Sequence, residues 1–429
     1  MAQKTKQWGA IIIMFALFAM IAFVTNLCAP MAIILKTQFA VPDSLATLGN
    51  MGNFIAYFIM GIPSGLLIQK LGYKKTALLA IVVGIIGVGV QYLAGLASPA
   101  YAFVVYLIGA FIAGFCMCML NCVVNPMLNT LGGGGNSGNQ LIQFGGVFNS
   151  TAAVSVTILM GALIGEITKD TQVSQAAPAL LGAIAVFVVS FIVLFFSNIP
   201  EPQVEEGPKE GNIELLKGAL SYRHFALGLV AIFCYMGIEV GVPQYLNLYL
   251  TGDKAEGGFG MAAGPAGLIV ALYWASMLIG RLCGGMLGSK FSPRAQISTV
   301  ASISIILVLL GMFSSSDNLV DFPIIDFANL GAGVVWTPVP MGVVALVLVG
   351  ICTAVMWGGI FNMAVEGLGK YTAIASGAFM TMVCGGGILI MLQGFVSEYT
   401  GTLMSYVVVL ACAIYVLFYA LIGSRPSKK

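Results

Sequence analysis

The sequence predicts an all-α membrane protein with twelve transmembrane helices in two related six-helix halves. Composition is the first observation, because 59% of the 429 residues are hydrophobic and only 8% are charged, whereas soluble domains carry roughly 25% charged residues. The second is a repeat. Residues 65–74 (GLLIQKLGYK) and 285–294 (GMLGSKFSPR) each place small residues before cations, about half a chain apart. A repeat of this period within apolar segments is typical of transporters built from two halves.

Twelve apolar stretches are long enough to cross a bilayer as helices, which takes about 20 residues. They lack the alternation of a barrel strand, and a helix satisfies its own backbone hydrogen bonds in lipid. The stretches are residues 8–35, 43–69, 76–97, 100–130, 140–166, 177–198, 224–250, 262–288, 295–314, 340–365, 371–397 and 401–423. Lys4 and Lys6 precede the first stretch, but it is longer than the apolar core of a signal peptide, so we expect it to be retained.

The distribution of cations predicts the orientation. With the N-terminus inside, only Lys36, Lys169 and Lys254 of the 18 Lys and Arg residues fall in outer loops. Cations concentrate on the cytoplasmic side, and shifting the register by one helix would invert the asymmetry. We therefore expect an integral protein of the bacterial inner (cytoplasmic) membrane with both termini in the cytoplasm.

One polar segment divides the chain. Residues 1–198 form the predicted first half, 199–223 a cytoplasmic linker rich in Pro, Glu and Gly, and 224–429 the second half. Within the linker, residues 212–221 are compatible with a short amphipathic helix at the membrane surface. Residues 315–339 are expected to form an external, solvated loop.

The halves match beyond the opening repeat, since Asn125 to Gly132 in the fourth helix mirrors Asn362 to Gly369 in the tenth. Parallel repeats of this kind place the substrate between the halves near the mid-plane, lined by helices 1, 4, 7 and 10 with helices 5, 8 and 11. The repeated motif predicts a cytoplasmic gate, in which helix 2 approaches helix 11 and helix 8 approaches helix 5. Its cations would bond helix C-terminal carbonyls. The gate residues are Gly65, Lys70, Lys74, Gly285, Lys290 and Arg294.

Glu239 is the one acidic residue well inside a predicted helix. A charge at mid-bilayer costs on the order of 2.5–3.5 kcal/mol, so such residues usually have a role. We interpret Glu239 as a substrate-binding and coupling residue that exchanges H+ or Na+. The alternative is a paired or neutral Glu that ties helices together.

Amide side chains form the second set of candidates. They offer a donor and an acceptor together, which suits the hydroxyl groups of a polyol, although amides also bond neighbouring helices. Trp274 and Trp357 lie inside the eighth and tenth helices, where an indole face could stack on a sugar ring or simply belong to the core. The amides predicted to bind substrate are Asn26, Asn121, Asn125, Gln143, Asn149, Gln244, Asn247, Asn362 and Gln393.

Several kinds of chemistry are excluded by what the sequence lacks. No Walker A motif occurs, and the GxGxxG pattern at residues 133–138 follows no strand, so we expect no nucleotide cofactor. His224 is the single histidine, and the nine cysteines lie in apolar helices. A metal site and a catalytic triad are therefore not expected. We predict no enzyme activity, no catalytic residues and no nucleic-acid partner.

The sequence resembles the major facilitator superfamily, and within it the fucose:proton symporter and glucose/galactose transporter family. The resemblance spans nearly the whole chain and rests on Asn125-Pro126, Phe148-Asn149-Ser150, Phe233-Cys234-Tyr235-x-Gly237-x-Glu239, Ile279-Gly280-Arg281, Phe361-Asn362, Gly385-Gly386-Gly387-Ile388 and Gly394-Phe395-Val396-Ser397. It implies the major facilitator fold. In the fucose symporter, acids in helices 1 and 4 carry coupling and sugar recognition. Ala29 and Asn121 stand at those positions here, so the sugar and the ion cannot be carried over.

We expect a secondary transporter that imports a neutral hexose, deoxyhexose or amino sugar by alternating access, with cation coupling through Glu239. A strongly anionic sugar would require a cation, and only Arg281, toward the cytoplasmic end of the eighth helix, lies near a helix interior. The alternatives are an uncoupled sugar facilitator and an exporter of another metabolite or drug. We expect a monomer whose partners are the small sugar and membrane lipid.

Overall fold

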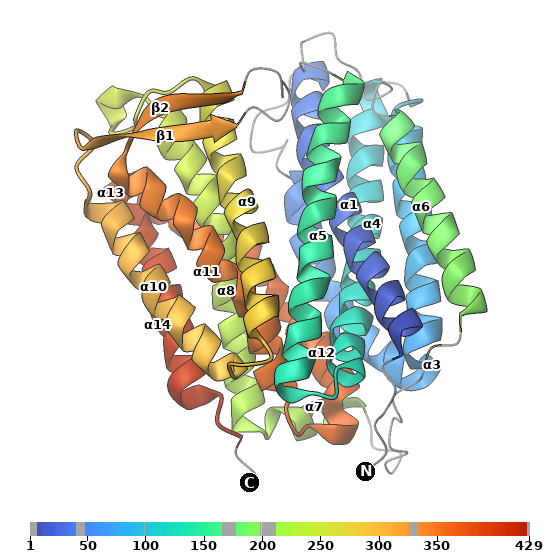
Figure 1. Ribbon diagram of the computed structural model, residues 1–429. Helices are drawn as coiled ribbons and strands as arrows, with labels where there is room; N and C mark the ends of the chain where they lie inside the picture. Colours follow the sequence, from blue (N-terminus) through green and yellow to red (C-terminus); the bar gives the residue numbers. More distant parts are fainter. Residues whose placement is uncertain are drawn as a thin grey trace. The chain divides into compact units, whose positions relative to one another are not determined.

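The structure is a computed structural model that describes residues 7–39, 48–97, 99–164, 177–197, 199, 212–325 and 333–426. The chain forms two compact units (Figure 1). Unit 1 is Met1–Gly134, Phe144–Ala219 and Gly367–Thr381, and unit 2 is Gly135–Gln143, Leu220–Glu366 and Met382–Lys429. The units thus follow the two halves of the sequence, except that each contains one short segment from the other half.

Unit 1 is helical in its described residues. It contains α1 (Trp8–Phe39), α3 (Leu48–Ala94), α4 (Pro99–Leu131), α5 (Gly135–Ile164) from Phe144 onward, α6 (Ala177–Phe196), nearly all of α7 (Asn212–Leu220) and α12 (Thr372–Thr381). The predicted second and third helices are the two arms of α3, separated at Gly72, whose φ of 82° and ψ of 172° are not helical. Glycine adopts a positive φ without steric cost, which explains the break at this residue. The short helix expected at 212–221 is present as α7.

Unit 2 contains the helices of the second half. These are α8 (Arg223–Thr251), α9 (Ala263–Leu287), α10 (Pro293–Phe313), α11 (Met341–Val365), α13 (Gly385–Thr400) and α14 (Val407–Phe418), which continues as a π-helical turn over Tyr419–Gly423. The predicted eleventh helix is divided into α12 and α13 by a 3-10 turn at Met382–Cys384. The Ser292 side chain caps α10 by accepting a hydrogen bond from the Ala295 amide, and Pro293 occupies the first turn.

The segment between α10 and α11 differs from the expected loop. Strands β1 (Leu319–Ile325) and β2 (Val334–Pro340) pair antiparallel, with Leu319 opposite Pro340 and Ile325 opposite Val334. Its Val and Ile residues favour a strand. Asp317 and Asp321 of this segment are exposed to solvent, as expected for a solvated segment.

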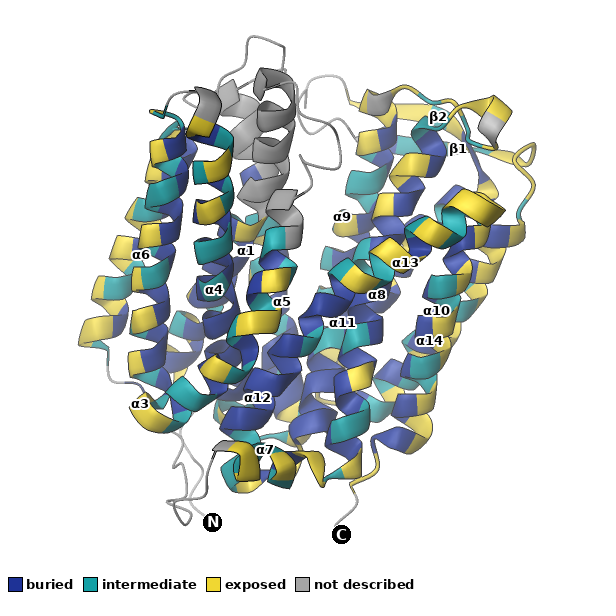
Figure 2. Ribbon diagram, turned by 180° about the vertical axis from the view of Figure 1, so that it is seen from behind, coloured by how far each residue is buried: buried dark blue, intermediate teal, exposed yellow. Residues whose placement is uncertain are grey.

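The helices have the length and surface of membrane spans. Ten stretches of the described residues are long and apolar enough to cross a membrane, and the one in α3 contains two predicted helices. Many of their large apolar side chains are exposed, as along α6, where Val189 is 59% and Phe196 81% exposed (Figure 2). Apolar exposure on this scale is expected where lipid covers the helices. The all-helical membrane fold class is confirmed, apart from the hairpin.

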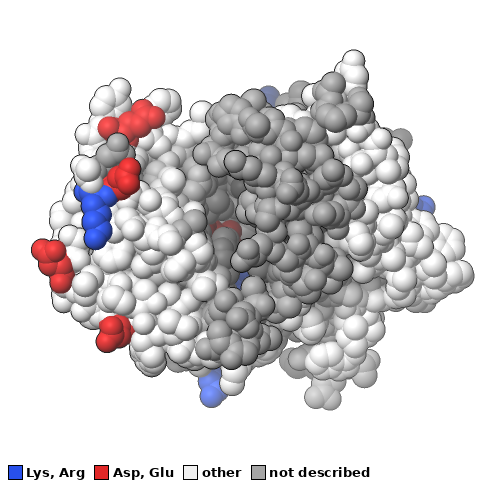
Figure 3. Space-filling model, turned by 90° about the horizontal axis from the view of Figure 1, so that it is seen from above, with Lys and Arg blue, Asp and Glu red and all other residues white. Residues whose placement is uncertain are grey.

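The two ends of unit 2 carry different charges. At the end that bears the hairpin, acidic side chains predominate over basic ones (Figure 3), and the exposed Asp317 and Asp321 belong to the hairpin segment. The opposite end carries four described cations, namely Arg223, Lys290, Arg294 and Arg425. This asymmetry has the sign that the distribution of cations in the sequence predicts.

Candidate functional site

The cations of the repeated motif bond helix ends in both units. In unit 1 the Lys74 ammonium donates to the carbonyls of Phe195 (2.9 Å) and Ser197 (2.7 Å) at the end of α6. In unit 2, Arg294 donates from Nε to the Ser424 hydroxyl and from Nη2 to the Ser424 carbonyl, each at 3.0 Å. Each cation thus stabilises the negative end of the last helix of its own half. Lys70 and Lys290 are exposed.

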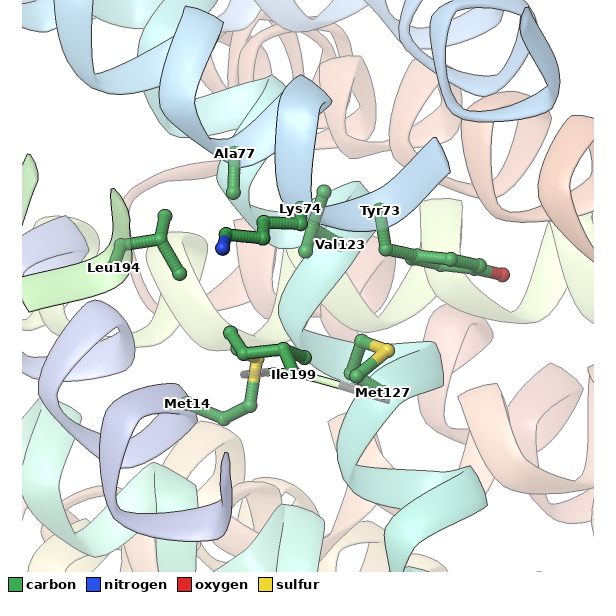
Figure 4. A pocket seen from close by; sticks show the side chains of 8 residues that line it. All are labelled: Met14, Tyr73, Lys74, Ala77, Val123, Met127, Leu194 and Ile199. Carbon is green, nitrogen blue, oxygen red and sulfur yellow. The ribbon is translucent and has the colours of Figure 1, made fainter. Parts of the chain in front are cut away.

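The surroundings of Lys74 do not form a ligand site. Its side chain extends between apolar residues of α1, α3, α4 and α6 and the segment after it (Figure 4). The gap there is too narrow to admit a water molecule. It is lined by Met14, Tyr73, Lys74, Ala77, Val123, Met127, Leu194 and Ile199. Lys74 therefore joins the start of the third predicted helix to the end of the sixth.

Glycines of α3 pack directly on the backbone of α12, within unit 1. A Cβ atom at Gly65 would lie 2.6 Å from the Ala373 carbonyl oxygen. At Gly61 it would overlap the Thr381 side chain and lie 2.6 Å from the Thr381 nitrogen. Helix α4 also contacts α12, because the Cys122 thiol lies 3.8 Å from the Ser376 carbonyl oxygen. The motif predicts that the second helix approaches the eleventh. The contact of the first arm of α3 with α12 at Gly65 is this approach.

The first turns of α5 are held within unit 2 by amide side chains. Gln140 donates to the Gly285 carbonyl at 3.1 Å, and Gln143 donates to the Val355 carbonyl at 2.9 Å. Asn362 donates to the Gly135 carbonyl at 3.1 Å. Gln143 and Asn362, predicted as sugar ligands, therefore make the interhelical bonds that were the alternative interpretation. The bond from Gln140 to Gly285 joins α5 to α9. These are the fifth and eighth predicted helices, which the motif predicts to approach each other.

A chain of polar side chains lies in the core of unit 1. Asn125 donates to the Asn121 carbonyl at 2.9 Å and to its Oδ1 at 3.4 Å. Asn121 in turn donates to the Tyr57 hydroxyl at 2.7 Å and to the Met117 carbonyl at 3.1 Å. Both asparagines are buried. The predicted candidates on α4 are therefore joined to Tyr57 of α3, which sequence reasoning did not single out.

Two other predicted ligands lie on the first half of the sequence. Asn149 donates to the Phe18 carbonyl at 3.0 Å, and beside it the rings of Phe15 and Phe148 stack with centroids 4.9 Å apart. This links α5 to α1 within unit 1. The side chain of Asn26 lies outside the described residues, as does that of Ala29.

In unit 2 Glu239 has a cationic partner. Its Oε1 lies 3.6 Å from Arg281 Nη2, and the side chains are only 14% and 11% exposed. Tyr235 is fully buried one turn earlier on the same helix, α8. The buried Tyr273 hydroxyl donates to the Glu239 carbonyl at 3.2 Å. The pair thus joins α8 to α9 in a partly accessible, charge-compensated arrangement.

Aromatic rings lie beside this ion pair. The Trp357 ring is 6.0 Å from that of Tyr235, and Trp274 meets Tyr273 edge-on at 5.3 Å. Trp274 is 41% exposed, so its indole is available to a ligand or to lipid. Aromatic faces next to hydrogen-bonding groups are the usual components of a small-molecule site.

The remaining candidates in unit 2 differ in burial. Gln393 is buried and donates to the Ser405 hydroxyl at 3.4 Å. Gln244 and Asn247 are exposed on α8. Gln393 is thus engaged inside unit 2, whereas Gln244 and Asn247 face outward, and all three stay predictions as substrate ligands.

Comparison with known proteins identifies the family. Residues 13–391 match the model of the Major Facilitator Superfamily. The chain is 26% identical over 414 residues to a glucose/galactose transporter of Brucella abortus, a match that covers 95% of this chain and 92% of the relative. It is 24% identical over 433 residues to the L-fucose-proton symporter of Escherichia coli, with the same coverage of 95% and 92%.

The fold agrees with that of a solved transporter. A crystal structure of the Escherichia coli fucose:proton symporter superimposes with a TM-score of 0.79 and 22% identity, covering 98% of this chain and 100% of that one. At this identity the likeness concerns the fold alone. Because the family model covers most of the sequence, the chain belongs to the Major Facilitator Superfamily and is a membrane transporter, not an enzyme.

Proposed function

We propose that this transporter imports a neutral sugar, namely a hexose, a deoxyhexose or an amino sugar, by alternating access. The full-length similarity to proteins named as glucose/galactose and fucose transporters supports a sugar. The observation that carries the proposal is the uncharged chain of Tyr57, Asn121 and Asn125 in the core of α3 and α4. Such groups can hydrogen-bond to the hydroxyl groups of a neutral sugar and replace the hydrogen bonds that the sugar makes to water.

Alternating access requires contacts that can break at one side of the membrane. Two contacts have this character, because each joins segments from different halves of the sequence. One is the packing of α12 on Gly61 and Gly65, and the other is the bonding of Gln140 and Gln143 to α9 and α11. We assign both to the cytoplasmic gate. They are neutral contacts, so their opening exposes no unpaired charge.

Coupling is proposed to occur at Glu239. A sodium ion on this carboxylate would lie near the Arg281 guanidinium, and two like charges about 4 Å apart repel by roughly 4 kcal/mol at an effective dielectric constant near 20. A proton instead neutralises Glu239 and releases Arg281 to the oxygens of the sugar. We therefore favour H+ over Na+. An uncoupled facilitator is the second candidate, because the intact ion pair is already neutral and needs no proton to cross.

The sugar assignment is tested by a binding screen. Purified protein in detergent should show a rise in unfolding temperature with one or a few neutral monosaccharides among D-glucose, D-galactose, L-fucose and N-acetyl-D-glucosamine, because a ligand that binds only the folded state stabilises it. Anionic uronates serve as the charged comparison. Stabilisation by none of the neutral sugars, with isothermal calorimetry in agreement, would reject a sugar as substrate.

We propose that the protein acts as a monomer in the bacterial inner membrane, with both termini in the cytoplasm. Labelling of single cysteines in a background without the nine native ones tests this orientation. Cysteines at Lys70 and Lys290, both exposed, should resist a membrane-impermeant thiol reagent in intact cells and react after lysis. A cysteine at Lys254, exposed at the opposite end of unit 2, is the control and should react in intact cells. The reverse pattern would overturn the proposed orientation.

A further inference from the structure

The hydroxyl of Tyr57 is a hydrogen-bond acceptor toward Asn121. The Asn121 Nδ2 atom lies 2.7 Å from the hydroxyl and 3.1 Å from the Met117 carbonyl oxygen. This second contact fixes the orientation of the amide, because an amide oxygen there would face a carbonyl oxygen without a proton between them. The group that faces Tyr57 is therefore the amide nitrogen, a donor, and the phenol oxygen must accept.

The remaining members of the chain hold this polarity. Asn121 Oδ1 receives a hydrogen bond from Asn125, which is fully buried and also donates to the Asn121 carbonyl. The donors thus point in one direction, from Asn125 through Asn121 to Tyr57. A phenol hydroxyl has one proton and can donate as well as accept. Among the described residues no acceptor receives the Tyr57 proton, so the chain ends in an unused donor.

Tyr57 lies near the end of the contact between α3 and α12. It lies one helical turn before Gly61 on α3, and Gly61 packs against Thr381, the last residue of α12. Since α12 ends at the level of Gly61, it does not extend along α3 as far as Tyr57. Its side chain is half-buried, whereas Asn121 and Asn125 behind it are buried.

We infer that Tyr57 is the sugar-binding residue of this part of unit 1 and that it donates its hydroxyl proton to an acceptor oxygen of the substrate. Asn121 and Asn125 are positioning residues that act through Tyr57, by occupying its oxygen and aiming its proton outward. The inference rests on the proposed sugar transport and adds a specificity rule. The substrate must present an acceptor at this point, such as a hydroxyl, ring or amide oxygen, and an ammonium group is rejected.

The test compares wild type with Tyr57→Phe, a change that keeps the ring and removes only the hydroxyl. Calorimetry uses whichever of D-glucose, D-galactose, L-fucose and N-acetyl-D-glucosamine binds wild type most tightly. Loss of one hydrogen bond to an uncharged group is expected to weaken binding roughly ten-fold. Tyr415→Phe is the matched control, because that hydroxyl donates to the Leu227 backbone carbonyl in unit 2. Binding to the control should be unchanged.

Analogues of the same sugar reveal the direction of the hydrogen bond. Fluorine in place of a hydroxyl can still accept weakly but cannot donate, whereas hydrogen can do neither. At one sugar position, wild type should prefer the fluoro analogue to the deoxy analogue, and Tyr57→Phe should bind the two equally. A purely structural role for Tyr57 would weaken all analogues alike and would overturn the inference.

A double variant tests the role of Asn121. If Asn121 acts through Tyr57, then adding Asn121→Ala to Tyr57→Phe should weaken binding less than two-fold beyond Tyr57→Phe alone. Additive losses would instead place Asn121 in direct contact with the sugar. Unchanged affinity in Tyr57→Phe would reject the inference while leaving sugar transport intact, whereas absence of sugar binding by wild type would reject both.

Discussion

Replacing Glu239 by Gln is expected to abolish the accumulation of sugar against its gradient while sugar exchange between equal concentrations continues. Gln has nearly the shape of Glu and represents its protonated form. Since the side chain can no longer lose or gain a proton, the carrier cannot couple sugar movement to the proton gradient. Sugar affinity should change by no more than a few-fold, because the amide still offers an acceptor oxygen to neighbouring donors.

The ion pair explains why net uptake should be lost although exchange persists. Glu239 and Arg281 lie 3.6 Å apart and compensate one another's charge. In the proposed coupling, this pairing lets the empty carrier change its exposure without carrying a bare charge through the membrane. In the same proposal, protonation of Glu239 ends the pairing and frees Arg281 to bind sugar oxygens. Glu239→Gln holds the site in this second state. Loaded carriers can still change face, which is all that exchange requires, but the proton-dependent step is missing.

Proteoliposomes allow both modes to be measured on one preparation. Wild type should concentrate sugar under an imposed inward proton gradient, and the ratio of internal to external sugar in Glu239→Gln should fall to about one. Glu398→Gln is the matched control, because Glu398 is exposed in the last turn of α13. A Glu239→Gln protein that still accumulates sugar would show that Glu239 is structural. A wild type that never accumulates sugar under proton or sodium gradients would establish the facilitator.

Helix positions were predictable because membrane spans are long and uniformly apolar. The sequence predicts that the second helix ends at residue 69 and the third begins at residue 76. The break in α3 at Gly72 lies between these two positions. Strands β1 and β2 were missed because each is only seven residues long. In addition β1 contains Asp321 and β2 contains Pro338 and Pro340, so neither length nor alternation distinguished them from a loop. The 3-10 turn at Met382–Cys384 interrupts a segment that is apolar throughout, so composition did not mark it.

The chemistry of the site was predictable only in part. An isolated Glu239 within an apolar helix is visible in the sequence, and so is Arg281, yet their contact depends on how α8 and α9 face each other. Charge balance was the available signal, since one acid and one cation lie inside neighbouring helices. The amides show the reverse limit. Gln143 and Asn362, like Asn121, are amide side chains within apolar helices, so the sequence does not distinguish them. In the structure, Gln143 and Asn362 donate to backbone carbonyls of other segments.

The glycine contact in unit 1 leads to the second large effect, expected for Gly65→Leu. A Cβ atom at this position would lie 2.6 Å from the Ala373 carbonyl and 3.0 Å from the Ile374 Cα. Both are backbone atoms, so no side-chain rotation relieves the overlap and α12 must move away from α3. Overpacking of this kind costs about 1–3 kcal/mol, which corresponds to a shift of roughly 5- to 150-fold in an equilibrium constant.

We expect Gly65→Leu to slow transport at least ten-fold, because the leucine disfavours the state in which the proposed cytoplasmic gate is closed and the carrier must pass through that state in each cycle. Gly89→Leu is the matched control on the same helix, since nothing lies within 4 Å of a Cβ there. Uptake into proteoliposomes gives the rate, and calorimetry in detergent should find sugar affinity within a few-fold of wild type.

The Cys122 thiol, 3.8 Å from the Ser376 carbonyl, reports the displacement of α12. In a background with Cys122 as the single cysteine, Gly65→Leu should raise its reactivity toward a thiol reagent, because α12 no longer covers it. Loss of sugar binding by a folded Gly65→Leu protein, with Cys122 still protected, would show that Gly65 lines the binding site and is not part of the gate.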